Sequence, residues 1–84
     1  MAEMRGILNR VERNDKGYVW IEIEQFRYEA PNIDNERFAR WRSLLDKRVV
    51  AVVHPWPIRT DDGKIKIVGR VSGLFEDHRN GMGD

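Results

Sequence analysis

Apolar and polar residues alternate along much of this chain, and glycine, proline, asparagine and aspartate separate the alternating stretches. Met4 to Arg13 (MRGILNRVER) predicts a first strand, and the NDKG that follows is a turn signal because Asn, Asp and Gly tolerate positive φ. The next stretch, YVWIEIEQ, has a clean period of two and predicts a second strand. Its core face carries Val19, Ile21 and Ile23, and its other face carries Tyr18, Trp20, Glu22 and Glu24.

A brief third strand and a helix are predicted next. FRYEAP ends at Pro31 and has Phe26 and Tyr28 on one face. The helix should run from about Asn35 to Leu45, because Asp34 is placed to cap its first turn. Its apolar stripe consists of Phe38, Trp41, Leu44 and Leu45, and Arg37, Arg40 and Arg42 lie mostly off that stripe.

Two more strands complete the pattern. Arg48 to Val53 (RVVAVV) is β-branched and nearly continuous, which predicts a strand covered on both faces and ended by Pro55. The last strand, KIKIVGRVSGL, places Ile65 and Ile67 on one face. Its two glycines, Gly69 and Gly73, mark positions where bends or bulges are expected.

The segment between these strands, HPWPIRTDDGK, is predicted to be a loop with its turn at Asp61, Asp62 and Gly63. Each proline fixes its own φ and favours extended backbone at the residue before it, so Pro55 and Pro57 should stiffen the loop and hold the indole of Trp56 in one direction.

Three strands, one helix and two further strands follow the order of the OB-fold, a five-stranded barrel. The resemblance is to a fold and covers roughly residues 4–74 of a single domain spanning 1–84. An SH3-like small barrel is the alternative, which a helix of this length suits less, and a helix-capped open sheet is a third option. The polar, glycine-rich residues 76–84 are expected to form a disordered tail.

Composition narrows the function classes. The chain has 84 residues, no cysteine, and 15 basic against 14 acidic residues, so the overall field of a strongly basic nucleic-acid binder is missing and any basic patch must be local. The start of the chain lacks a signal-peptide pattern, and no apolar run is long enough to span a bilayer, so we expect a soluble cytoplasmic protein without membrane contact.

Catalysis is not expected. His54 and His78 form no recognisable metal pair or base–nucleophile pair, and Asp61 with Asp62 suits a turn. No glycine-rich phosphate loop is present in the sequence. We therefore predict a non-enzymatic protein without catalytic residues, metal or cofactor.

Aromatic residues suggest a binding surface. In single-strand binding proteins each base stacked on an aromatic side chain contributes about 1–3 kcal/mol. The candidate stacking residues are Tyr18, Trp20, Tyr28 and Trp56, and the candidate phosphate contacts are Arg27, Arg59, Lys64 and Lys66. These residues favour a non-catalytic module that binds single-stranded DNA or RNA with weak sequence preference in the cleft of an OB-like barrel.

Other interpretations of these residues stay open. Glu22 and Glu24 share the face of Trp20 and would repel phosphates, which favours a structural or adaptor subunit that mediates protein–protein interaction or self-association. Trp56 alternatively covers the open end of the barrel, and the cations are then ordinary solubilising charges. A sugar-binding barrel is a third hypothesis.

Overall fold

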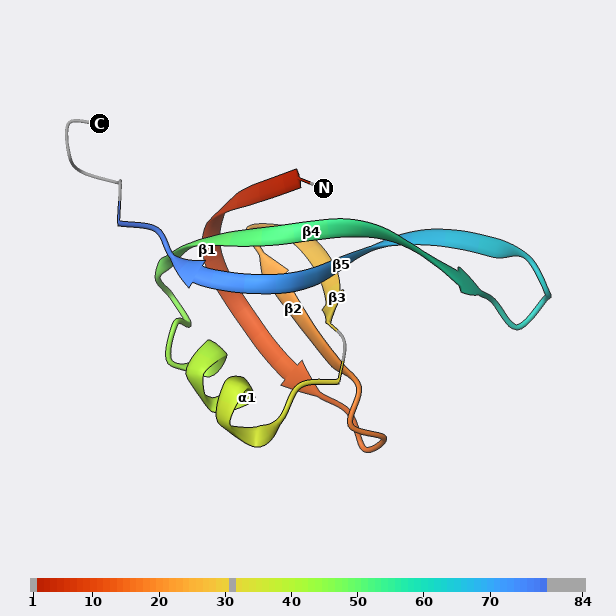
Figure 1. Cartoon of the computed structure of the whole chain (residues 1–84), viewed down its shortest axis with the longest axis horizontal. Coiled ribbons are helices and arrows are strands. Elements are labelled where there is room, and N and C mark those ends of the chain that lie inside the picture. Colours follow the sequence, from red (N-terminus) through yellow and green to blue (C-terminus); the bar gives the residue numbers. More distant parts are fainter. Residues whose placement is uncertain (1, 31, 79–84) are drawn as a thin grey trace.

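Five strands form a closed barrel in the order β1-β2-β3-β5-β4, and β4 returns to pair with β1 (Figure 1). The computed structural model describes residues 2–30 and 32–78. The strands are β1 (Ala2–Arg13), β2 (Val19–Ile23), β3 (Phe26–Ala30), β4 (Arg48–Arg59) and β5 (Ile65–Glu76), and the helix is α1 (Asn35–Arg42). The predicted fold class is confirmed: the protein is mainly β with one helix, and its closed five-stranded barrel matches an OB-fold or an SH3-like small barrel.

The core lies where the inward faces of the strands meet. Its buried side chains are Leu8, Val11, Val19, Ile21, Ile23, Ala30, Trp41, Val49, Ala51, Val53, Val71 and Leu74. The predicted core face of β2 is therefore correct. On β4 the residues between the buried ones, Val50 and Val52, are only half-buried. The expectation of a strand covered on both faces is wrong, because a barrel strand has one face toward the core and one toward solvent.

The helix begins as predicted and ends earlier. Asp34 caps it, since its carboxylate accepts a hydrogen bond of 2.7 Å from the backbone N–H of Arg37. Trp41 is buried in the core. After Arg42 the chain continues in tight turns to Asp46, whose φ of 69° is left-handed, and this reversal delivers the chain into β4. The helix thus stops three residues before the predicted Leu45.

The largest departure from prediction is at HPWPIRTDDGK, which is strand and turn. β4 continues through both prolines to Arg59 and remains paired with β5 as far as Ile65. Only the turn between Thr60 and Lys64 connects them. β1 pairs with β4 only up to Val53, so beyond that point the two strands project from the barrel as an arm, residues 55–69 (Figure 1).

The two-residue spacing of the prolines allows both of them to stand in a paired strand of the arm. Residues two apart in a strand direct their backbone nitrogens to the same edge. Pro55 and Pro57 are therefore compatible with the ladder to β5 when both ring nitrogens lie on the opposite edge, and β1 no longer uses that edge past Val53. Prolines at an unpaired edge also hinder pairing with another strand.

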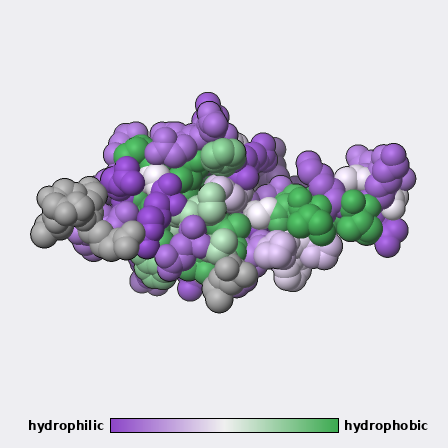
Figure 2. All heavy atoms as spheres, turned by 90° about the horizontal axis from the view of Figure 1, so that it is seen from above, coloured by the Kyte–Doolittle hydropathy of each residue, from purple (hydrophilic) through white to green (hydrophobic). Residues whose placement is uncertain are grey.

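The two faces of the arm differ in character. Residues paired across an antiparallel ladder point to the same side, so the buried pair of Val53 and Val71 marks the side that faces the core. On the arm this inward side carries Pro55, Pro57, Ile65, Ile67 and Gly69, and the outer side carries Trp56, Ile58, Lys66 and Val68. Ile65 and Ile67 share a face as predicted, but they are 60% and 61% exposed. Figure 2 shows hydrophobic residues at the surface of the arm as well as over the barrel.

The C-terminal segment is ordered further than expected. Glu76 belongs to β5 and pairs with Val49. Asp77 is buried, its N–H donates to the carbonyl of Arg48 at 2.9 Å, and its carboxylate lies 3.4 Å from the guanidinium of Arg5. The prediction of a disordered tail from residue 76 is therefore wrong at its start, and its last part, 79–84, lies outside the described residues.

Candidate nucleic-acid interface

One row of side chains crosses the barrel surface over four strands. Trp20 on β2 pairs with Glu29 on β3, Glu29 pairs with Arg70 on β5, and Arg70 pairs with His54 on β4. These residues alternate with buried ones along their strands, so they all point away from the core. We call this surface, with the outer side of the arm, the outer face.

Two tryptophans on the outer face each carry a stacked arginine. The Cζ of Arg27 lies 4.1 Å from the ring centroid of Trp20, and the Cζ of Arg70 lies 4.2 Å from that of Trp56. Each contact contributes about 0.5–1 kcal/mol at an exposed site. Trp56 is 45% exposed and lies on the outer side of the arm, so part of its ring is open to a ligand.

A carboxylate lies between these two stacks. Glu29 is the cross-strand neighbour of both Trp20 and Arg70. The hydroxyl of Tyr18 donates a hydrogen bond to its Oε1. Tyr18 is therefore linked to the outer face by its hydrogen bond to Glu29. Its side chain is half-buried and does not form an open stacking surface. The negative charge at Glu29 makes this central position unsuited to a phosphate.

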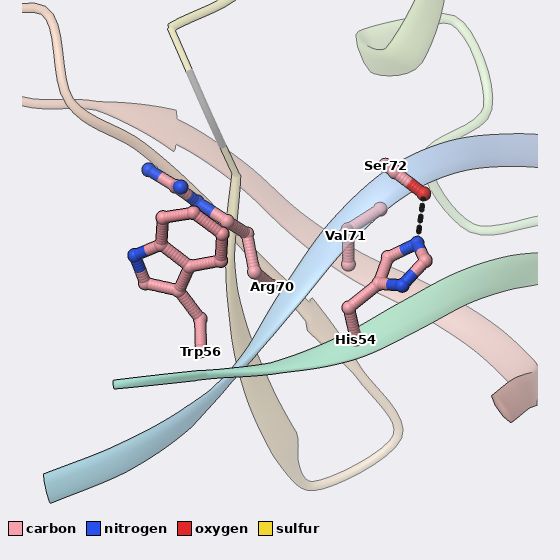
Figure 3. A pocket seen from close by; sticks show the side chains of 5 residues that line it. All are labelled: His54, Trp56, Arg70, Val71 and Ser72. Carbon is pink, nitrogen blue, oxygen red and sulfur yellow. Dashed lines mark hydrogen bonds between the residues drawn. The ribbon is translucent and has the colours of Figure 1, made fainter. Parts of the chain in front are cut away.

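Two hollows flank Glu29. One has a volume of about 340 Å³ and lies between β4 and β5 (Figure 3). It is lined by His54, Trp56, Arg70, Val71 and Ser72. The other, about 380 Å³, lies between β3 and β5 and is lined by Arg27, Glu29, Lys66, Ile67, Val68 and Gly69. The second hollow joins Arg27 and Lys66, two of the cations predicted to contact phosphate.

Tyr28 is not on this surface. It pairs with Ile21, on the side of β2 that faces the core, and packs against that core. A Cβ placed on Gly69 would lie 2.9 Å from the Cδ1 of Tyr28, so the ring covers this glycine. Burial raises the pKa of the Tyr28 hydroxyl above its usual 10.0. The grouping of Tyr28 with Trp20 as one stacking platform is therefore wrong.

Two other predicted phosphate contacts lie at the far end of the arm. Arg59 ends β4 and pairs with Ile65, and Lys64 belongs to the turn after it. Both are exposed, and neither is among the described residues that line the two hollows. The structure therefore brings together Trp20, Arg27, Trp56 and Lys66 of the predicted set, with Tyr18 at the margin.

Of the two glutamates expected to repel phosphate, Glu22 and Glu24, only Glu22 lies on the outer face. Glu24 leaves the strand with a φ of 55°, and its carboxylate accepts a hydrogen bond of 2.7 Å from the N–H of Ile7. Glu24 thus belongs to the junction with β1, where it lies against Gly6. Glu22 stays on the outer face, where it is the cross-strand neighbour of Arg27 in the pairing of β2 with β3.

Sequence reasoning missed Arg70, His54 and Ser72 as members of this surface. Alternation from Lys66 places Arg70 on the same face of β5, and that signal could have identified it. The same alternation places Ser72 on that face of β5, and alternation after the inward Val49, Ala51 and Val53 places His54 on the outer side of β4.

Among residues 2–30 and 32–78, no cluster of histidine, aspartate and glutamate side chains is arranged to hold a metal ion. The helix in the same part of the chain is too short to cross a membrane. Comparison with protein-family models, with curated proteins and with solved structures finds no match for this chain.

Proposed function

We propose that this protein is a non-catalytic module that binds single-stranded DNA or RNA across its outer face, with weak sequence preference. The observation that carries the proposal is the pair of Arg–Trp stacks on one barrel surface, at β2–β3 and on the arm. In the OB-fold, the β2–β3 face and the β4–β5 connection are regions that bind oligonucleotides.

The chemistry of the surface suits unpaired bases. Bases of a single strand can lie flat on an indole or on a planar guanidinium, whereas the bases of a duplex are stacked on one another and unavailable. Three cations, Arg27, Lys66 and Arg70, lie along the same surface and would contact the backbone. Because Glu29 lies between the stacks, we expect a base and not a phosphate at that position.

Tryptophan fluorescence tests this proposal. Trp20 and Trp56 lie on the proposed surface, whereas Trp41 is 3% exposed in the core. An oligonucleotide that stacks on the outer face should quench the wild type and leave a Trp20→Phe, Trp56→Phe double variant, which keeps only Trp41, unquenched. Equal quenching of both proteins would show that any bound strand lies elsewhere.

A second candidate function rests on the inward side of the arm. Ile65 and Ile67 are largely exposed there beside two exposed prolines, which is an apolar surface typical of protein interaction sites. Two copies of the chain could cover it by a two-fold pairing in which each arm presents the same side chains. This self-association is the specific form we give to the adaptor alternative.

Light scattering tests this alternative, because it measures whether the protein is a monomer or a dimer. Self-association predicts a dimer at micromolar concentration that Ile65→Ser with Ile67→Ser converts to a monomer. The matched control is Ile58→Ser, since Ile58 lies on the outer side of the same arm. A wild type that remains monomeric over the full concentration range would remove the two-fold pairing from consideration.

A further inference from the structure

The hollow beside Trp56 has the size and walls of a site for one flat ring system. Its volume is about 340 Å³, at the small end of the roughly 300–1,000 Å³ that ligand pockets occupy. One wall is the indole of Trp56 with the guanidinium of Arg70 over it (Figure 3). A planar ligand could stack on that pair. It would meet a cation there and not a carboxylate, since none of the described residues that line this hollow is acidic.

The opposite wall is polar. The Nε2 of His54 lies 2.8 Å from the Oγ of Ser72, and Figure 3 shows the two side chains meeting beside Val71. This hydrogen bond uses one ring nitrogen of His54 and part of the capacity of the hydroxyl. The Nδ1 of His54 and the remaining capacity of the Ser72 hydroxyl stay able to bond a ligand.

This wall lies beside a bulge in β5. Val52 pairs with Gly73 and Val53 pairs with Val71, so Ser72 is an extra residue on β5 without a partner of its own on β4. Alternation from the buried Val71 places Ser72 on the outer side of β5 together with Arg70, and there its hydroxyl meets the ring of His54.

We propose that this hollow holds a single base of the bound strand, stacked against Trp56 and Arg70, and that His54 and Ser72 hydrogen-bond to its polar edge. The proposal rests on the proposed function and deepens it. Bases differ in the donors and acceptors of their edges, so this one position distinguishes bases while the Trp20 stack does not. A net hydrogen bond of about 0.5–1.5 kcal/mol corresponds to a preference of roughly 2- to 12-fold.

The test measures the affinities of three labelled homopolymers, oligo-dA, oligo-dC and oligo-dT of equal length. In a homopolymer the hollow meets the same base in every register, so sliding does not average the preference. His54→Phe keeps a ring and removes its hydrogen bonds, and Ser72→Ala removes an exposed hydroxyl. Both variants should shift the affinity ratios among the three homopolymers by roughly 2- to 12-fold. Trp20→Ala, the comparison variant, should weaken all three by the same factor.

The outcomes separate the two proposals. If wild-type protein binds no homopolymer, the proposed function fails and this site fails with it. If the homopolymers bind and Trp20→Ala weakens them, but His54→Phe and Ser72→Ala leave the ratios unchanged, only the base-reading site is overturned. Urea unfolding midpoints equal to that of the wild type show that the variants are folded.

Discussion

Replacing the two surface tryptophans by alanine should weaken single-strand binding independently at each position. Each substitution removes one stacking ring, which costs about 1–3 kcal/mol, or roughly 5- to 150-fold in Kd. Three strand intervals of about 4.8 Å separate Trp20 on β2 from His54 on β4, and Trp56 lies two residues of about 3.3 Å beyond His54, which places the two tryptophans roughly 16 Å apart over the sheet. At such a separation the effects are nearly additive. The double variant should therefore lose about 2–6 kcal/mol.

Fluorescence anisotropy with a labelled oligo-dT of about twelve nucleotides, within the range of OB-fold site sizes, measures these losses. Phe26→Ala is the matched control, because Phe26 is an exposed aromatic on β3 that pairs with Ile23, on the side opposite Trp20. It should bind as the wild type does. Wild-type affinity of Trp20→Ala and Trp56→Ala, or an equal loss in Phe26→Ala, would contradict stacking on these two tryptophans.

Three further predictions concern the fold that positions the site. Gly69→Ala places a Cβ 2.9 Å from the ring of Tyr28. The variant should lower the free energy of unfolding, measured by urea titration, by about 1–3 kcal/mol. An unchanged free energy of unfolding would contradict this close packing. Because folding raises the pKa of Tyr28, the contribution of this residue to stability is fully present below pH 10 and is lost as pH rises through the folded pKa. Tyr28→Phe should therefore flatten the fall in unfolding free energy above pH 10. An unchanged fall would refute this prediction. Asp34→Ala removes the cap that accepts from Arg37 and should cost about 1 kcal/mol, measured by thermal unfolding, whereas an unchanged Tm would show that the cap contributes nothing.

The barrel was predictable because local signals and global topology agree. The alternation of β2 identified Val19, Ile21 and Ile23 as core, and Asp34 marked the helix start. Turn signals and periodicity together gave the order of elements along the chain, three strands, a helix and two strands. Each of these signals depends on side-chain periodicity or on capping, which act within a few residues of the chain.

The arm was not predictable by the same reasoning. Pro55 normally indicates the end of a strand, and whether a proline is tolerated depends on which edge its nitrogen faces. That edge is known only once the pairing of β1 with β4 is seen to end at Val53. For this reason the segment from His54 to Arg59 was predicted to be a loop although it belongs to β4.

Only part of the site could be predicted, because side chains of different strands meet on one surface only when the strands pair in the right register. Tyr28 and Trp20 lie on adjacent strands, but their pairing places Tyr28 opposite Ile21 and hence inward. Arg70 reaches Trp56 through the register of β4 with β5, which shifts at Ser72. A one-residue difference in register moves a side chain to the other face, and the sequence of a single strand does not specify its register with the next.

The salt dependence of single-strand binding tests the central claim most directly. Labelled oligo-dT and oligo-U, with a duplex control, would be titrated at 50 and 200 mM salt. Three phosphate contacts from Arg27, Lys66 and Arg70 predict a slope of about −2 in log K against log salt, or roughly a 20-fold loss of affinity over this range, with weaker binding of the duplex. Absence of single-strand binding at the lower salt concentration, or equal affinity for the duplex, would contradict the account.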